Sequence, residues 1–150
     1  MKKKKVLAIA SVGGHWIQLL RLRPAFEGAD LEFMSTKESF ASMVQGHVFH
    51  AVPDASRWNK LKLIWSFLKI FNVIRKTKPD VIITTGAAPG VMGLFAGKLL
   101  GSKTIWVDSI ANVEKLSMSG VLATKFADKV YTQWPDLATD NIIYKGNVLS

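Results

Sequence analysis

The fold is decided by one stretch near the start of the chain, Val6-Leu7-Ala8-Ile9-Ala10-Ser11-Val12-Gly13-Gly14-His15-Trp16. Five consecutive apolar residues indicate a buried strand, and two glycines before a helical pattern indicate a strand-loop-helix unit. Glycine allows a close approach of the backbone to a ligand, and a helix N-terminus offers free N–H groups to an anion. We therefore expect His15 at the carboxyl edge of a sheet, where such folds bind ligands. The stretch lacks the full G-x-G-x-x-G spacing and a P-loop lysine, so alone it is equally consistent with a tight turn.

The composition is that of one domain. A length of 150 residues with 49% hydrophobic content is enough for one buried core, so residues 1–150 are expected to form a single domain. The absence of cysteine excludes disulfides and thiolate zinc sites. His47 and His50 flank a predicted strand start and are a minor candidate pair for a metal; we predict no metal site.

The net charge of +9 is concentrated in two segments. Eleven of the 20 Lys and Arg residues fall within residues 2–5 and 57–78, which contain no acidic residue. The rest of the chain is slightly acidic, so the basicity is a local feature. Only five apolar residues follow the basic start, too few for a signal peptide. The uncharged window 81–97 contains glycines and a proline, which favour strand, loop and helix over a membrane span.

Residues 57–78 predict a long helix that ends before Pro79. Its polar stripe is narrow, and its apolar arc is wider than packing on a sheet requires. Basic side chains beside aromatic ones suit a helix that lies at an anionic lipid surface. The candidates for membrane contact are Trp58, Lys62, Trp65, Phe67, Lys69 and Phe71. The alternative is an ordinary helix that packs on the sheet with a solvated lysine edge.

Apolar strands alternate with helical patterns along the chain. Strands are predicted at 6–10, 31–34, 48–52, 80–84, 103–107, 129–132 and 142–144, and helices at 16–26, 39–44, 57–78, 91–100 and 117–126. This order predicts an α/β, Rossmann-like, doubly wound and mostly parallel sheet with right-handed crossovers. Residues 85–90 form a second glycine loop, and Asp108 follows a strand, where a carboxylate can enter a ligand site.

Three sets of residues resemble the Alg14 family. They are Ser11-Val12-Gly13-Gly14-His15, Thr85-Gly86-Ala87-Ala88-Pro89-Gly90, and the block from Asp108 to Gly120 that continues through Phe126-Ala127-Asp128-Lys129 and Gln133-Trp134-Pro135. The resemblance covers nearly the whole chain. Bacterial members of this family include capsular and exopolysaccharide subunits of the PssD and EpsE type. The chain is also similar, more distantly, to the amino-terminal half of MurG-like glycosyltransferases of the GT-B fold.

The resemblance implies the acceptor half of a split GT-B glycosyltransferase. An Alg13- or PssE-like partner would supply most of the UDP-sugar site, so this chain would bind no cofactor itself and would be inactive alone. The pair would transfer a hexosyl or N-acetylhexosaminyl group to a polyprenyl-diphosphate-linked acceptor, in capsular polysaccharide, exopolysaccharide or lipid-linked oligosaccharide synthesis. Because only Met1 to Lys5 precede the first strand, we expect peripheral attachment at the cytoplasmic face of the membrane.

The chemistry of glycosyl transfer suggests roles for the loop residues. A base must deprotonate the attacking hydroxyl, and an imidazole ordinarily titrates near neutrality, so His15 is the predicted base. Asp108 and Glu114 are further candidates for the base or for recognition of an acceptor hydroxyl; Glu114 has the alternative role of a helix cap. Backbone amides are predicted to hold the acceptor diphosphate. They belong to the two glycine loops, at Gly13, Gly14, Gly86, Pro89 and Gly90.

Other functions remain open from the sequence. The chain could recruit a catalytic partner to the membrane without taking part in chemistry. A stand-alone dinucleotide-binding module fits the first glycine loop, although no acidic residue follows it with clear fingerprint spacing. Nucleic-acid binding is disfavoured because the charge is clustered beside an apolar face. For the partner contact, Gln133-Trp134-Pro135 and residues 142–149 offer an apolar surface, and Trp134 is equally consistent with a core position.

Overall fold

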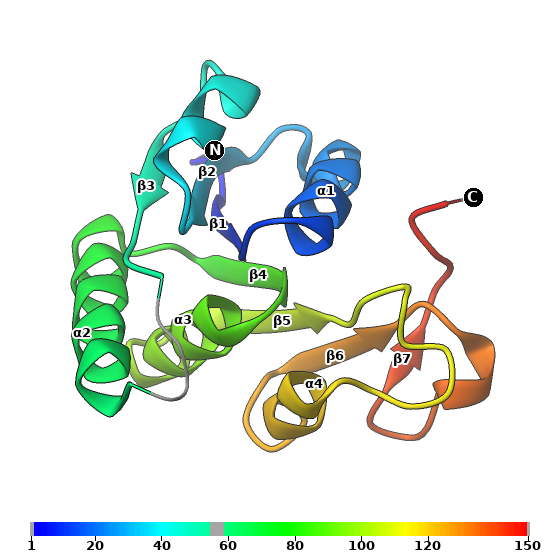
Figure 1. Cartoon of the computed structure of the whole chain (residues 1–150). Helices are drawn as coiled ribbons and strands as arrows, with labels where there is room; N and C mark the ends of the chain where they lie inside the picture. The colour runs from blue at the N-terminus through cyan, green and yellow to red at the C-terminus, as the bar shows by residue number, and fades with distance from the viewer. Residues whose placement is uncertain (1, 55–58, 150) are drawn as a thin grey trace.

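The chain folds around one parallel sheet, as the sequence predicts. The computed structural model describes residues 2–54 and 59–149, and in these residues it has seven strands in the order β3-β2-β1-β4-β5-β6-β7 (Figure 1). Every neighbouring pair is parallel. The strands are β1 Lys5–Ala10, β2 Asp30–Ser35, β3 Phe49–Ala51, β4 Val81–Gly86, β5 Lys103–Val107, β6 Lys129–Thr132 and β7 Ile143–Tyr144. The doubly wound α/β fold is confirmed.

Helices cover both faces of the sheet, which explains why its central strands are continuously apolar. The helices are α1 Gly14–Arg21, α2 Lys60–Thr77, α3 Ala88–Leu99 and α4 Met118–Ala123, with 3-10 turns η1 Arg23–Phe26, η2 Glu38–Val44 and η3 Pro135–Leu137. Leu7 and Ile9 of β1 belong to the core under α2, α3 and α4. Val6 and Ala8, which alternate with them, belong to the core under α1 and η2.

Several predicted helix boundaries are wrong, for local reasons. The helix predicted at 16–26 divides into α1 and η1, because Pro24 lacks an N–H group and cannot continue α1. The segment predicted as a helix at 39–44 is the 3-10 turn η2. The helix predicted at 117–126 is the shorter α4, which Ser117 caps by accepting a hydrogen bond from Gly120 N at 2.9 Å.

Helix α2 is well delimited at both ends. The side chain of Asn59 caps its start by accepting a hydrogen bond from Lys62 N at 3.0 Å. Its end is marked by Lys78 in the left-handed conformation, with φ of 50°, followed by Pro79. The helix was predicted to begin at Arg57, but Arg57 and Trp58 lie outside the described residues.

One exposed ion pair ties the outer layer to the sheet near β6. Lys98 Nζ of α3 lies 2.8 Å from the carboxylate of Asp128, which also accepts a hydrogen bond from Thr104 N of β5 at 2.8 Å. The Lys98 contact, with the hydrogen bonds from Thr104, holds the pKa of Asp128 below its ordinary value of 3.8. Asp128 therefore joins α3, β5 and the start of β6.

Candidate functional site

The segments that follow β1 and β4 meet at the middle of the carboxyl edge of the sheet. Strands β1 and β4 are direct neighbours, and Ser11 N donates a hydrogen bond to Gly86 O at 3.0 Å. After β1 the chain runs into α1 over one face, and after β4 it runs into α3 over the other (Figure 1). This reversal is the topological switch point at which open α/β sheets bind ligands. The predicted edge position of His15 is confirmed.

His15 is held on the end of β4 by two hydrogen bonds. Its Nδ1 lies 3.0 Å from Thr85 O, and Thr85 Oγ1 donates to the backbone oxygen of His15 at 2.6 Å. Because a carbonyl oxygen only accepts, the proton of the neutral ring sits on Nδ1 and the lone pair on Nε2. The ring is partly exposed. His15 is therefore oriented as a base that can accept a proton at Nε2.

Gly86 makes room for this ring. Its φ is +124°, a conformation that side-chain-bearing residues rarely adopt, and a Cβ on it would lie 2.7 Å from His15 Nδ1. Its N–H is already donated to Thr84 Oγ1 at 3.1 Å. Gly86 thus contributes space and not a free amide, which corrects the predicted role of its N–H in anion binding.

The remaining predicted anion-binding residues separate into two groups. Gly13 and Gly14 are exposed at the start of α1, where Gly13 is the N-cap and no side chain caps the helix. Their position fits the predicted contact with an anion. Pro89 and Gly90 do not form a loop as predicted but lie buried in the first turn of α3. Proline has no N–H, and Gly90 packs closely on the Thr84 side chain, so these two residues shape the site.

Asp108 lies at the end of β5 and is almost completely buried, with 1% of its surface exposed. Its carboxylate accepts hydrogen bonds from Trp106 Nε1 at 3.0 Å and Asn112 Nδ2 at 3.1 Å. Ser117 gives it two more, from N at 3.0 Å and from Oγ at 2.6 Å. Four donors occupy the lone pairs of a carboxylate. The geometry therefore favours a positioning role for Asp108, fixing the loop 109–117, over the predicted contact with substrate.

Glu114 is exposed on this same loop. The helix-capping alternative for it is wrong, because Ser117 caps α4. Its predicted part in catalysis stays a prediction.

Two side chains brace this loop from neighbouring segments: Gln18 of α1, which the sequence did not single out, and Trp134, which follows β6. Gln18 of α1 is buried and donates a hydrogen bond to Ser109 Oγ at 3.1 Å. Trp134 Nε1 donates to Ile110 O at 2.7 Å, so the half-buried Trp134 braces the loop. The sequence did contain a signal for the contact of Gln18 with Ser109. Gln18 is a single polar residue on the buried side of α1, beside Trp16 and Leu19, and a buried amide needs a hydrogen-bond partner.

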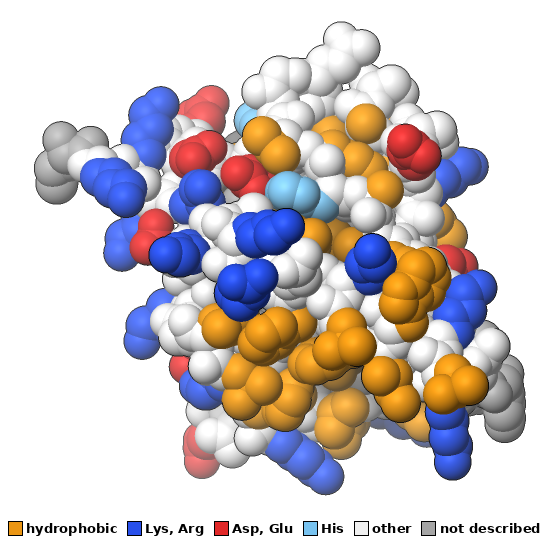
Figure 2. Space-filling view, turned by 90° about the vertical axis from the view of Figure 1, so that its left-hand side faces the viewer, with side chains coloured by type: hydrophobic (Ala, Val, Ile, Leu, Met, Phe, Trp, Pro, Cys, Tyr) orange, Lys and Arg blue, Asp and Glu red, His pale blue; other side chains and the backbone are white. Residues whose placement is uncertain are grey.

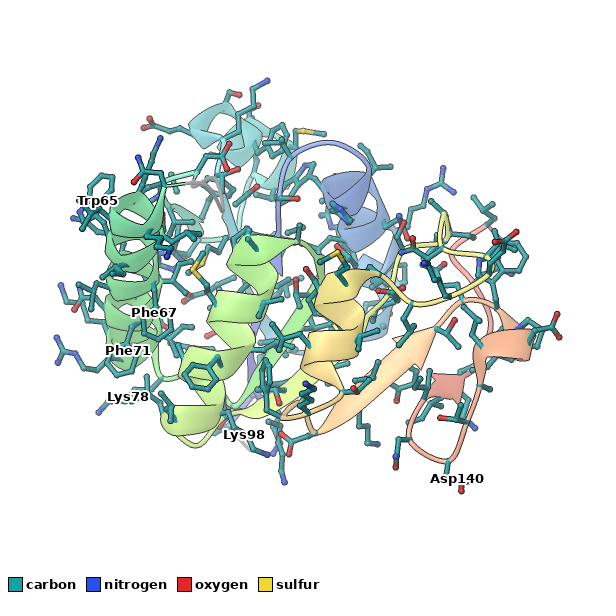
Figure 3. All side chains as sticks on the ribbon, turned by 60° about the horizontal axis from the view of Figure 1, so that its bottom comes forward. Trp65, Phe67, Phe71, Lys78, Lys98 and Asp140 are labelled. Carbon is teal, nitrogen blue, oxygen red and sulfur yellow. The ribbon has the colours of Figure 1, made fainter. Side chains whose placement is uncertain are left out.

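The predicted membrane-contact residues of α2 do not all face outward. Trp65 is 50% exposed and points away from α3 (Figure 3). Lys62 and Lys69 are also exposed. Phe67 and Phe71, which were predicted to contact the membrane, are partly buried and pack against the core instead. Trp58 lies outside the described residues. The exposed apolar residues of α2 are Leu61, Ile64, Trp65 and Leu68, called the α2 patch below.

The α2 patch lies in a wider apolar surface. Figure 2 shows hydrophobic side chains gathered on the side of the molecule that carries α2, with Lys and Arg around them. Helices α3 and α4, on the same face of the sheet, add the exposed side chains Phe95, Leu99, Met118, Val121 and Leu122. Within the described part of the chain, none of the helices combines the length and hydrophobicity needed to cross a bilayer.

The edge site comprises Gly13, Gly14, His15 and Gly86. The two other histidines lie outside it and have protein partners of their own. His50 Nε2 lies 2.9 Å from Glu32 Oε2, and His47 Nδ1 lies 2.9 Å from Leu31 O. Among residues 2–54 and 59–149, His, Cys, Asp and Glu side chains form no group of three or more that could hold a metal ion.

Relatives of known name match most of the chain. Residues 33–148 match the model of a family described as "Oligosaccharide biosynthesis protein Alg14 like". The "UDP-N-acetylglucosamine transferase subunit alg14" of Schizosaccharomyces pombe is 31% identical over 166 residues, covering 91% of this chain and 79% of that protein. The human subunit of that name is 29% identical, with 88% and 76% covered. That of Yarrowia lipolytica is 38% identical over 79 residues, which are 49% of this chain and only 37% of that protein.

Solved structures share the fold at low sequence identity. MurG of Acinetobacter baumannii superposes with a TM-score of 0.78 at 16% identity, over 96% of this chain and 46% of MurG. A UDP-GlcNAc 2-epimerase of Methanocaldococcus jannaschii gives a TM-score of 0.71 at 16% identity, over 95% of this chain and 45% of the epimerase. The chain thus spans less than half of either protein, and its fold is close to the amino-terminal-type domain of GT-B enzymes. The family match over most of the chain shows that it belongs to the Alg14-like family of oligosaccharide biosynthesis proteins.

Proposed function

We propose that this chain is the acceptor-binding subunit of a two-chain glycosyltransferase that moves a sugar from a UDP-sugar to a polyprenyl-diphosphate-linked acceptor. The names of its relatives, "UDP-N-acetylglucosamine transferase subunit", support both a transferase and a second chain, and make UDP-N-acetylglucosamine the first donor to test. The pathway would be the synthesis of capsular polysaccharide, exopolysaccharide or lipid-linked oligosaccharide.

The observation that carries this proposal is the orientation of His15. Its Nδ1 is engaged by Thr85 O, and its Nε2 is left to take a proton at the ligand-binding edge of the sheet. In the proposed reaction the acceptor hydroxyl gives its proton to Nε2 and its oxygen bonds to C1 of the sugar. The bond from C1 to the diphosphate oxygen breaks, and UDP leaves with the electron pair. A well-placed base contributes about 10²–10⁴-fold to such a step.

The start of α1 suits the acceptor diphosphate. Gly13 and Gly14 are exposed there, immediately before His15, and the helix dipole adds a partial positive charge. A diphosphate at this position would bring the attached sugar close to the imidazole. Glu114, exposed on the neighbouring loop, is a candidate for contact with an acceptor hydroxyl.

The donor would be bound mainly by an Alg13- or PssE-like partner. The printed names of its relatives describe a transferase subunit, which supports a second polypeptide that would supply the donor-binding half. We propose that the isolated chain is inactive and binds no cofactor of its own.

The α2 patch and its basic neighbours would hold this subunit at the cytoplasmic face of the membrane without spanning it. Trp65 lies beside Lys69, whose Nζ is 5.8 Å from the centre of the indole ring. This pairing suits the interface, where an aromatic ring enters the headgroup region and each nearby Lys or Arg adds on the order of 1 kcal/mol with anionic lipid.

Charging the α2 patch should release the chain from membranes. With Trp65→Asp and Leu68→Asp combined, co-sedimentation with vesicles containing anionic phosphatidylserine is expected to fall by about 10²-fold, since burial of such side chains is worth roughly 1.5–3 kcal/mol each. Both side chains are at least half exposed, so the fold should persist. The control is Ile17→Asp, 46% exposed on α1 over the opposite face of the sheet. Equal losses for both variants would contradict a membrane role for α2.

The proposed function is tested by reconstitution. The chain is co-purified with its Alg13- or PssE-like partner and assayed for transfer from UDP-N-acetylglucosamine to polyprenyl-diphosphate acceptors in vesicles. Transfer by the pair, and by neither chain alone, is expected. Failure to form a complex or to transfer any UDP-sugar tested would overturn the proposal.

A second candidate is a non-catalytic recruiter that only brings its partner to the membrane, and the large exposed apolar surface on α2, α3 and α4 favours it. It predicts that changes at the edge site leave the activity of the membrane-bound pair intact. The His15 variant described in the Discussion therefore separates the two candidates.

A further inference from the structure

Two buried glutamines, Gln18 and Gln133, meet behind the edge site. Gln18 lies on α1 and is 8% exposed; Gln133 follows β6 and is 3% exposed. Gln133 Nε2 donates a hydrogen bond to Gln18 Oε1 at 2.6 Å. We propose that this pair, the glutamine junction, is a positioning device that sets the loop 109–117 relative to His15 for catalysis. The inference rests on the proposed function.

The junction holds the loop at its first residues. Gln18 Oε1 also accepts a hydrogen bond from Ile110 N at 3.1 Å, and Gln18 Nε2 donates to Ser109 Oγ at 3.1 Å. Gln133 Nε2 donates a second hydrogen bond to Asp108 O at 2.9 Å. The backbone from Asp108 to Ile110 is therefore fixed by side chains of α1 and of the segment after β6.

The same junction reaches the carboxyl-terminal segment. Gln133 Oε1 accepts a hydrogen bond from Val148 N at 2.9 Å, and Arg21 at the end of α1 donates to Val148 O at 3.3 Å. The two glutamine amides thus connect four parts of the chain: α1, the start of the loop 109–117, the segment after β6 and the carboxyl-terminal segment. Because buried amides are costly to leave unpaired, the arrangement specifies a single position for each part.

His15 is one helical turn before Gln18 on the short helix α1. Each is bound to a different partner at the carboxyl edge of the sheet: His15 to Thr85 near the end of β4, and Gln18 to the loop after β5. The loop also carries Glu114, and its far end is held by Asp108 through Ser117. Releasing Gln18 would therefore alter the distance between His15 and the loop without removing a group that touches substrate.

The test compares Gln18→Met with Gln133→Met in the reconstituted pair. Methionine keeps the volume and removes the hydrogen bonds. Each variant is expected to lower kcat by about tenfold, because small displacements of reacting groups are costly, with KM for the UDP-sugar unchanged. Since both act through one junction, the double variant should lose no more than the larger single loss. Gln18→Glu keeps the two acceptor contacts and should recover most of kcat.

A matched control separates positioning from stability. Ser102→Ala removes another buried hydrogen bond, from Ser102 Oγ to Pro79 O at 2.7 Å, at the opposite edge of the sheet. It should lower the melting temperature and leave kcat unchanged. Equal losses of kcat for Ser102→Ala and Gln18→Met, or multiplied losses in the double variant, would overturn the positioning role.

A second measurement does not depend on activity. Amide hydrogen exchange of Ile110 should accelerate by at least about tenfold in Gln18→Met and not in Ser102→Ala, since Gln18 is its acceptor. An inactive wild-type pair would overturn the proposed function, whereas unchanged exchange at Ile110 would overturn the junction.

Discussion

Replacing His15 with asparagine is expected to lower the turnover of the two-chain enzyme by about 10²-fold or more, the contribution of a general base. The asparagine Nδ2 can occupy the place of the imidazole Nδ1 and keep the hydrogen bond to Thr85 O, which is 3.0 Å long in the wild-type chain. The fold and the N-terminus of α1 should therefore persist, while the lone pair at Nε2 is lost. The measurement is the initial rate of sugar transfer by the reconstituted pair, at saturating donor and acceptor.

Binding measurements complete this experiment. The His15→Asn variant should co-purify with the partner and sediment with vesicles as the wild type does, because His15 lies away from the α2 patch. Wild-type turnover with intact binding would remove His15 from the chemistry and favour the recruiter. Loss of binding together with turnover would show instead that the substitution had disturbed the fold.

Replacing Gly86 with alanine should damage both stability and activity. Its φ of +124° is a strained conformation for alanine, with a cost of about 1–3 kcal/mol in the free energy of unfolding. The added Cβ would lie 2.7 Å from His15 Nδ1, so the imidazole must move. Because displacement of a reacting group by about 1 Å costs as much as 10²-fold in rate, turnover is expected to fall by at least about tenfold.

Gly101 supplies the matched control. Its φ is also positive, at +92°, but a Cβ there would meet no atom within 4 Å, and it lies before β5 at the opposite edge of the sheet. Gly101→Ala should therefore lower the free energy of unfolding by a similar strain term and leave turnover unchanged. Chemical denaturation and the transfer assay on both variants separate the two effects. If Gly86→Ala kept full activity, the close contact with the His15 ring would have no part in catalysis.

Much of the edge site followed from local sequence signals. Apolar strand residues followed by glycines placed Gly13, Gly14 and His15 at a strand end, and an alternating strand-helix order implied that parallel strands end at one edge. The same signals misassigned Pro89 and Gly90 to a loop. Proline is tolerated in the first turn of a helix, so α3 begins before both residues.

The sequence was less informative about which side chains of α2 are exposed to solvent and which pack against the core. A helical wheel of 57–78 showed a wide apolar arc, but it could not show that Phe67 packs toward α3. The ring centre of Phe67 lies 6.1 Å from that of Phe95 on α3. The Phe95 ring in turn packs edge-to-face on Phe126, which follows α4 in the chain. Leu61, Ile64 and Leu68 are exposed because these contacts fix the rotation of α2 on the sheet.

The sequence by itself determined the order of strands and helices, the first glycine loop and the family resemblance, because periodicity and turn chemistry are local properties of the chain. Only the tertiary structure decided that Asp108 is saturated by Trp106, Asn112 and Ser117, and that Gln18 and Gln133 meet. The glutamine pair joins residues 115 positions apart. Such contacts depend on strand order and helix orientation, which are set by burying both faces of the sheet at once and not by any single segment.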